Sequence, residues 1–237
     1  LGKEGQRIYV RQSIKNPVEF KKPEPYQPME VLDTNISIRT VETQQDAIEA
    51  IRCIYSEYGY SYSYESLYYV DAFLKAIQER QLISFLAVNE HGQTAGHFAL
   101  SFSELFKNMP EISSVVIRRE FRGLKLFSKF VEHCIKIAEE QHFRALMGQP
   151  VAYHTKTQKV LMSTGFTATS LLMSYIAADL ESEYNQGERL DLCAGVRIMD
   201  PTAQSIVYPP EELIPFIHKV YDRLGWKYEI REDYRPA

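Results

Sequence analysis

From residue 36 onward, the spacing of apolar residues alternates between the two-residue repeat of strands and the 3.6-residue repeat of helices. Ile36 and Ile38 alternate with polar neighbours, which predicts a short strand. The letters T-Q-Q-D at 43–46 have the pattern of a capped helix N-terminus, and Gly59 is expected to end that helix. The apolar positions between them recur at helical spacing: Ala47, Ile48, Ile51, Ile54, Tyr55 and Tyr58. A second helix is expected to follow, with an apolar face of Val70, Phe73, Leu74 and Ile77.

The middle of the chain continues with strand and helix patterns. Residues 82–88 and 94–102 flank a turn and predict an antiparallel hairpin, and a third strand is expected at 113–117. A long amphipathic helix follows, with an apolar face of Phe127, Phe130, Val131, Cys134, Ile135 and Ala138. Beyond it we expect a strand at 145–151, a short helix at 155–163, a turn at Gly165 and a strand at 166–176. This order predicts an α/β fold with a central mixed sheet flanked by helices.

The two ends of the chain differ from this regular centre. Residues 1–33 carry four of the 11 prolines and, apart from an alternating stretch at 7–10, have the composition of a linker. The acidic stretch 179–188 predicts a boundary, followed by a strand pattern at 190–198 and a helix pattern at 213–224. We therefore expect an N-terminal extension at 1–35, a central domain at 36–178 and a smaller C-terminal α/β lobe at 179–237. The Gly225-Trp226 step resembles Gly165-Phe166, which suggests a half-repeat of the central domain.

Composition narrows the class of protein. The 237 residues are 45% apolar and 24% charged, which excludes a disordered chain and supplies enough apolar residues for a large core. No stretch approaches the roughly 18 uninterrupted apolar residues of a membrane span, and the three widely spaced cysteines favour free thiols in a reducing compartment. We therefore expect a cytoplasmic protein without a membrane partner. The net charge of −4 argues against nucleic acid as a partner, and no spacing of ligands predicts a metal site.

One stretch reverses the charge of the whole chain. Between residues 118 and 129, five cations stand against Glu120 alone, so that +5 − 1 gives a local charge of +4. These cations are Arg118, Arg119, Arg122, Lys125 and Lys129. They lie where the long helix is expected to begin, and cationic side chains there oppose the helix dipole. A bound anion would offset that cost, so strand, basic turn and helix together favour a phosphate-binding site.

The same stretch carries a family resemblance. The letters V-V-I-R-R-E-F-R-G-L-K-L-F at 115–127 are similar to the strand and Q/R-x-x-G-x-G/A loop of the GNAT N-acyltransferases, and K-V-L-M-S-T-G-F at 159–166 is similar to the family's closing helix and Gly-Phe turn. The resemblance implies the GNAT fold over residues 36–178 and acetyl-CoA, or another acyl-CoA, as the acyl donor. It implies donor-binding roles for Val115, Val116 and Ile117 on the strand, and for Arg122, Gly123, Leu124, Lys125, Leu126 and Phe127 in the loop.

The chain departs from the family pattern in three respects: the loop, the acid and the base. Lys125 and Phe127 stand where the loop motif has small residues, and the Lys125 side chain could either obstruct the loop or bind a phosphate through its ammonium group. In many GNAT enzymes, the general acid is a tyrosine four residues before the glycine of the Gly-Phe turn. In this chain Leu161 stands at that position. The strand at 113–117 holds no acidic residue that could act as a base, and Glu111 lies at its edge.

Other residues are therefore the catalytic candidates. They are His97 as a base within a hairpin strand, and Tyr153 or His154 as an acid at the mouth of the expected cleft. Each has a structural alternative: hydrogen-bonded scaffold for His97, packing for Tyr153, and a surface or helix-capping role for His154. Seven tyrosines fall between residues 55 and 69; of these Tyr60, Tyr62 and Tyr64 are candidates for substrate contact, with packing between helix and loop as the alternative.

Two functional hypotheses follow from the resemblance. The first is an acyl-CoA-dependent transferase that moves an acetyl group to an amine. The alternative is a catalytically inactive GNAT-like module that senses acyl-CoA or binds a partner within a regulatory protein, which the replaced tyrosine and the altered loop favour. The letters L-G-K-E-G at 1–5 are similar to the end of an ATP-binding module of the anti-sigma or histidine-kinase type, which precedes GNAT domains in some bacterial proteins, so such a module is a further expected partner.

Overall fold

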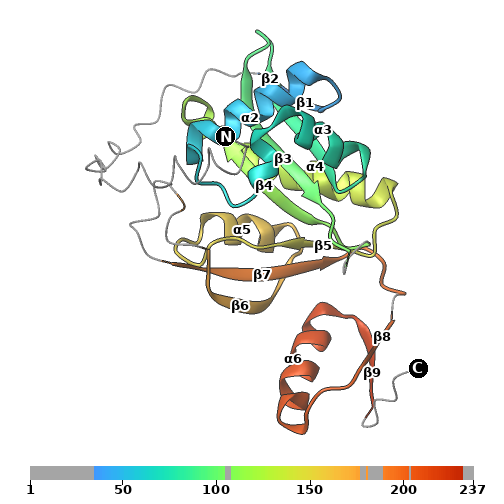
Figure 1. Ribbon diagram of the computed structural model, residues 1–237. Helices are drawn as coiled ribbons and strands as arrows, with labels where there is room; N and C mark the ends of the chain where they lie inside the picture. The colour runs from blue at the N-terminus through green and yellow to red at the C-terminus, as the bar shows by residue number, and fades with distance from the viewer. Residues whose placement is uncertain (1–34, 105–107, 177–179, 181–188, 203, 232–237) are drawn as a thin grey trace, which may run out of the picture.

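The computed structural model describes residues 35–104, 108–176, 180, 189–202 and 204–231. Its main sheet has seven strands in the order β1-β2-β3-β4-β5-β7-β6 (Figure 1). They are β1 (Ile36–Thr40), β2 (Leu82–Asn89), β3 (Thr94–Ser101), β4 (Glu111–Ile117), β5 (Ala145–Gly148), β6 (Thr167–Ile176) and β7 (Leu190–Ile198). Only β4 and β5 pair in parallel, and the other neighbours are antiparallel. The expected α/β fold with a mixed sheet is confirmed.

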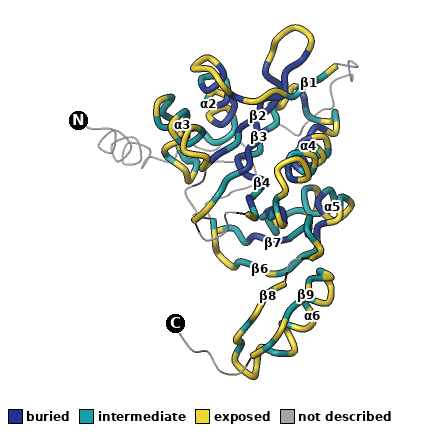
Figure 2. The backbone as a smooth tube through the Cα atoms, turned by 90° about the vertical axis from the view of Figure 1, so that its right-hand side faces the viewer, coloured by how far each residue is buried: buried dark blue, intermediate teal, exposed yellow. Residues whose placement is uncertain are grey.

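Helices cover both faces of this sheet (Figure 2). On one face lie α2 (Gln44–Tyr58), α3 (Val70–Gln78) and the short 3-10 helix η1 (Glu65–Tyr68), and on the other lie α4 (Leu126–Glu140) and α5 (Lys156–Ser163). A second 3-10 helix, η2 (Arg119–Phe121), connects β4 to α4. The expected capping of α2 is confirmed, because Thr43 and Asp46 accept each other's backbone amides. None of the described helices is long and apolar enough to cross a membrane.

The alternation of strand residues creates two cores, one on each face. On the α4 face, the rings of Phe85, Phe98 and Phe130 stack, with centroids 4.9 and 4.3 Å apart. On the α2 face, Phe73 and Ile54 are fully buried against Leu86. Burial of each such side chain stabilises the fold by roughly 1.5–3 kcal/mol, so the two faces hold the sheet rigidly between helices.

The expected domain boundary falls between two strands that pair with each other. Thr167 to Ile176 of β6 pairs with β7, and β7 also pairs with β5, so the main sheet continues past residue 179. The strand pattern at 190–198 is thus part of the central sheet, because its alternating small and apolar residues fit between two strands. The expected extension at 1–35 and the strand at 7–10 lie outside the described residues, apart from residue 35.

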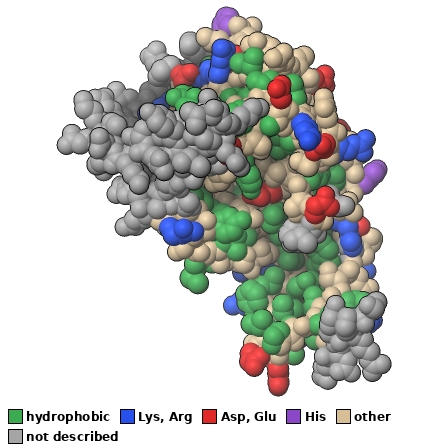
Figure 3. Space-filling model, viewed as in Figure 1, with side chains coloured by type: hydrophobic (Ala, Val, Ile, Leu, Met, Phe, Trp, Pro, Cys, Tyr) green, Lys and Arg blue, Asp and Glu red, His purple; other side chains and the backbone are tan. Residues whose placement is uncertain are grey.

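A small β-α-β unit lies at the C-terminal end of the described chain (Figure 1). It consists of β8 (Gln204–Val207), η3 (Glu211–Leu213), α6 (Ile214–Leu224) and β9 (Lys227–Ile230), with β8 and β9 parallel. None of the described residues in these elements is buried. Figure 3 shows hydrophobic side chains gathered on the surface of this unit. Trp226 lies beside Arg144, whose guanidinium carbon is 5.9 Å from the ring centroid, which joins the unit to the start of β5.

Candidate functional site

The central sheet opens between β4 and β5. The two strands are in register only at Glu111 with Met147 and at Ile112 with Gly148. After these two pairs, β4 no longer pairs with β5. Among the described strands it then pairs with β3 alone, and the last pair is Ile117 with Gly96. An opening therefore begins after Ile112 and widens toward the end of β4.

The cause of the opening is that the chain after β5 follows β7 instead of β4. Gly148 pairs with Gly195, the amide of Cys193 then donates to the carbonyl of Pro150, and the amide of Ala152 donates to Asp191. Pro150 has no amide hydrogen with which to continue a ladder toward β4. The sequence G-Q-P at 148–150 thus separates the two strands.

A bulge in β4 lies beside this opening. The register with β3 shifts between His97 and Ala99, and Ser114 has a φ of 50°, which is uncommon for a residue other than glycine. The bulge is held by His97, whose Nδ1 donates to the Ser114 carbonyl and whose Nε2 accepts from the Ser84 hydroxyl, each over 2.9 Å. This histidine bonds all three strands β2, β3 and β4.

His97 is fully buried, and burial lowers its pKa from 6.5 to about 4. Its neutral ring has both nitrogens occupied by hydrogen bonds, so the arrangement favours the scaffold role that the sequence left open. Its expected role as a catalytic base stays a prediction.

The loop between β4 and α4 presents a row of backbone amides. None of the amides from Gly123 to Ser128 donates a hydrogen bond to the part of the chain that the structure describes, and α4 begins without a side-chain cap. The first amides of a helix have no partner within the helix, so they need an acceptor from outside. Gly123 has a φ of 90° and Lys125 lies in the left-handed region with a φ of 55°; turns with such residues are typical of backbone nests that bind anions. Such a row suits a phosphate group.

Two of the cations in the loop are directed toward α2. Arg122 donates to Glu57 over 2.8 Å and to the Ile117 carbonyl over 3.3 Å, and Arg118 lies 3.8 Å from Glu49. These arginines join the loop to the neighbouring helix. Three further cations are exposed around the row of amides and form no ion pair with described residues: Arg119, Lys125 and Lys129. The positive charge expected near a phosphate therefore comes from these three residues.

A cavity of about 290 Å³ lies on the α2 face where β4 and β5 are still paired. Glu111 and Ser113 line it from β4, Met147 from β5 and Tyr64 from the loop before η1. Burial raises the pKa of Glu111 from 4.5 to about 7, which is the range of a general base at neutral pH. The Ser113 hydroxyl is buried and has no hydrogen-bond partner among the described residues.

The three tyrosines expected to contact substrate lie at different distances from this cavity. Tyr64 lines it, and the nearby Glu111 adds to the burial that raises the pKa of Tyr64. Tyr62 donates to the Ser114 hydroxyl over 3.2 Å, beside the bulge. Tyr60 is 53% exposed, and its ring contacts Tyr55 and Tyr68 outside the cavity. The ring contacts thus form two chains, and the one that runs from Tyr58 through Tyr62 to Tyr64 reaches the cavity.

The candidates for the acid lie after β5, across the opening from β4. Tyr153 is 60% exposed and His154 is half-buried, with its carbonyl accepting from Gln158 over 2.8 Å. Neither lines the cavity that contains Glu111. Leu161, which stands where the family has its tyrosine, is buried, and a Cβ on Gly148 would lie 2.9 Å from its Cδ1. An apolar contact with β5 therefore occupies that position.

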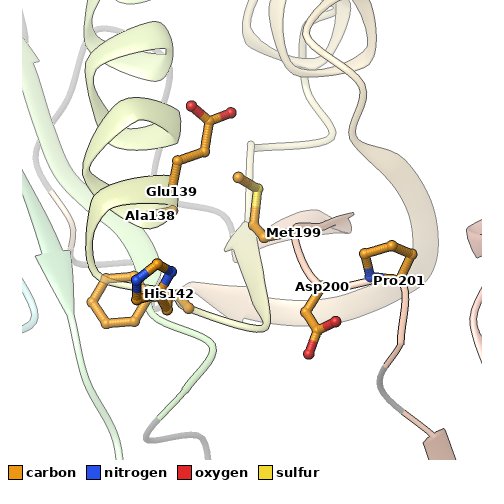
Figure 4. A pocket seen from close by; sticks show the side chains of 7 residues that line it. Ala138, Glu139, His142, Met199, Asp200 and Pro201 are labelled. Atoms are coloured by element: carbon orange, nitrogen blue, oxygen red, sulfur yellow. The ribbon is translucent and has the colours of Figure 1, made fainter.

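A second cavity of about 400 Å³ lies at the opposite end of α4 (Figure 4). Glu139 and His142 face it from the helix end, and Met199, Asp200 and Pro201 line it after β7. The 15 residues of α4 separate it from the row of amides by about 22 Å. The described residues contain no group of three metal-ligating side chains, here or elsewhere. Nothing in this cavity suits acyl transfer.

Sequence reasoning named the phosphate loop, but it missed two residues of the cavity. Glu111 was noted only as the edge of the strand, because its cavity depends on Tyr64 and Met147, which are distant in sequence. Ser113 was placed in the strand without a role. A signal was present, since Glu111 and Ser113 are two apart and so share one face of a strand.

The comparisons with known proteins agree with this geometry. The model of the acetyltransferase (GNAT) family matches residues 47–166. No curated protein sequence matches the chain.

Solved structures of acetyltransferases share the fold at low sequence identity. The spermidine/spermine N-acetyltransferase SpeG from Vibrio cholerae is 13% identical with a TM-score of 0.56, over 69% of this chain and 95% of that one. The ribosomal-protein-S18-alanine N-acetyltransferase from Escherichia coli is 14% identical with a TM-score of 0.55, over 70% and 95%. The ribosomal-protein-S5-alanine acetyltransferase from Vibrio fischeri is 14% identical with a TM-score of 0.55, over 70% and 93%.

Proposed function

The chain belongs to the acetyltransferase (GNAT) family, and we propose that it transfers the acetyl group of acetyl-CoA to a primary amine. The proposal is carried by the row of amides from Gly123 to Ser128, which have no partner in the described part of the chain and follow the strand that borders the opening. A diphosphate is an acceptor that such a row can bind, and the three exposed cations around it add attraction. The donor's chain would then run along Val115, Val116 and Ile117 into the opening.

We assign the general base to Glu111. A primary amine has a pKa of about 10.4, so a carboxylate with an ordinary pKa is a poor acceptor for its proton. Burial brings Glu111 closer to the amine in proton affinity by roughly 3 kcal/mol, and with a pKa of about 7 roughly half of the carboxyl groups are ionised at neutral pH. Once the ammonium group has lost its proton to Glu111, the nitrogen lone pair can attack the thioester carbonyl carbon.

The same carboxyl group can also complete the proton balance. After the attack, the nitrogen still carries two hydrogens and a positive charge. When the carbon–sulfur bond breaks, the thiolate takes the proton that Glu111 holds, and the carboxylate freed in this way takes the second proton from the nitrogen and passes it to solvent. A thiol has a pKa of about 8.5, so proton transfer from an acid with a pKa near 7 is favourable. The reaction therefore does not require a tyrosine at Leu161. Tyr153 and His154 remain proposals for this acid, with exposure to the opening as their support.

A second function has one specific observation in its favour. The buried Leu161 removes the usual acid, which fits a module that binds acyl-CoA without transferring the acyl group. The two functions share the donor site and differ in turnover.

The donor site is tested by calorimetry with coenzyme A on the wild-type protein, Lys125→Gly and Lys125→Glu. If the backbone amides bind the phosphates, Lys125→Gly binds within a few-fold of wild type, because glycine tolerates the left-handed conformation, and Lys125→Glu weakens binding about tenfold or more. Unchanged affinity in Lys125→Glu would remove the phosphate-site argument. If coenzyme A binds but no primary amine causes release of thiol from acetyl-CoA, the function is instead that of a sensor of acyl-CoA.

A further inference from the structure

The cavity beside Glu111 has two chemically different walls. Besides Tyr64 and Glu111, six uncharged polar residues line it: Ser66, Gln81, Ser101, Ser103, Ser113 and Ser114. The rest of its lining is apolar: Leu67, Ala76, Leu82, Phe102, Met109 and Met147. The ligand that fits must therefore have both a polar and an apolar side.

Charge in this lining is confined to one group. Glu111 is the single carboxyl group among the described lining residues, and none of them is an arginine, lysine or histidine. One ammonium group can thus be paired. Among these described lining residues, a carboxylate or phosphate on the same ligand would find no cation near Glu111, and a second ammonium group would find no second anion.

Ser113 marks the place of a second polar group. Its hydroxyl is buried without a partner among the described residues, and it lies two residues from Glu111 on the same face of β4. A buried hydroxyl without a partner is costly, so a ligand that supplies one gains affinity. Because the ammonium group occupies Glu111, a neutral hydroxyl on the ligand is the partner that fits Ser113.

Resting on the transferase function above, we propose that the acceptor is an amino alcohol: a primary amine with one positive charge, a neutral hydroxyl near the amine and a small apolar body. At roughly 30 Å³ for each water-sized group, the cavity holds about ten non-hydrogen atoms. Glu111 takes the ammonium group, Ser113 the hydroxyl, and the wall with Phe102 and Met147 the hydrocarbon part.

Matched amines test the proposal with the full chain and acetyl-CoA. Phenylalaninol and phenylalanine differ only in a hydroxymethyl or carboxylate group, and spermidine adds further ammonium groups. We expect kcat/KM for phenylalaninol to exceed that for phenylalanine and spermidine at least about 100-fold. Faster turnover of phenylalanine or spermidine would overturn the proposal that the acceptor is an amino alcohol. So would the absence of turnover with both phenylalaninol and serinol, a smaller amino alcohol. The transferase itself fails only if coenzyme A does not bind or no amine is acetylated.

Two variants locate the specificity. Ser113→Ala removes a hydroxyl without a partner, so we expect it to fold as well as wild type by thermal unfolding. It should raise KM for phenylalaninol about tenfold and leave KM for 2-phenylethylamine, which lacks the hydroxyl, unchanged. Equal changes for both amines would contradict a bond to Ser113. Gln81→Arg adds a cation at an exposed lining position and should raise kcat/KM for phenylalanine about tenfold; no gain would contradict the charge argument.

Discussion

At the scale of single residues, titratable groups that look alike in the sequence have different roles in the structure. Both ring nitrogens of His97 form hydrogen bonds inside the sheet. Glu111 instead lines a cavity, and burial raises the pKa of its carboxyl group to about 7. Arg122 has an acidic partner on α2, whereas Lys125 is exposed in the same loop. The difference comes from neighbours that are far away along the chain.

We predict that His97 makes the protein less stable in acid. The unfolded chain takes up a proton at this residue near pH 6.5, but the folded protein does so only near pH 4. The free energy of unfolding therefore falls as the pH falls between these values, by about 3 kcal/mol from this residue. Urea unfolding at pH 7 and pH 5, between which about 2 kcal/mol of this loss is expected, measures the change in wild type and in His97→Gln, which does not titrate.

The control for this measurement is His91→Gln, at an exposed position in the turn between β2 and β3. It should retain the wild-type dependence. Glu111 contributes with the opposite sign, because its raised pKa makes the folded state lose stability as the pH rises through 7. The comparison between variants removes that contribution. If His97→Gln and wild type lose the same free energy in acid, the buried neutral imidazole is contradicted.

At the scale of elements, close packing between α4 and the sheet positions the donor site. A Cβ on Gly96 of β3 would lie 2.7 Å from the Val116 carbonyl oxygen and 3.0 Å from Phe130 Cζ. The first of these atoms belongs to the backbone of β4 and cannot rotate away. The absence of a side chain at Gly96 therefore lets both α4 and β4 lie close to β3, near the end of β4 that leads to the row of amides.

We predict that Gly96→Ala destabilises the fold by about 1–3 kcal/mol and weakens coenzyme A binding, because β4 must move away from β3. Gly195→Ala on β7 is the matched control, since its Cβ would lie 3.4 Å from the nearest atom, the Thr167 carbonyl oxygen, which is an ordinary contact. The urea midpoints of the two variants give the comparison. Equal midpoints would show that this close approach does not constrain the sheet.

Much of the fold could be predicted from local patterns. Helical spacing and the capping letters predict α2, α3 and α4 nearly to their ends, and the basic turn lies between β4 and α4 as expected. The pairing of β7 with β5 and β6 could not be predicted, because an acidic connector separates it from β6 and the neighbours of a strand leave little trace in its own letters. The ion pair of Arg122 with Glu57 spans 65 residues and left no local signal.

At the scale of the whole molecule, the donor and acceptor sites that we propose lie at the two ends of β4. The row of amides follows the end of the strand, and the cavity with Glu111 lies at its start. The seven residues of β4 span about 23 Å, a length that the extended arm of coenzyme A can follow along the opening. The β-α-β unit at the C-terminal end lines neither site among the described residues.

Release of thiol from acetyl-CoA in the presence of phenylalaninol, followed from pH 5 to 9, is the most direct test of this arrangement. The account predicts a kcat/KM that rises with pH through about 7 as Glu111 loses its proton, and a loss of roughly 100-fold or more in Glu111→Gln. Glu132→Gln, at an exposed position on α4, should match wild type. Full activity in Glu111→Gln, with the same rise through pH 7, would contradict the assignment of the base and with it the central claim.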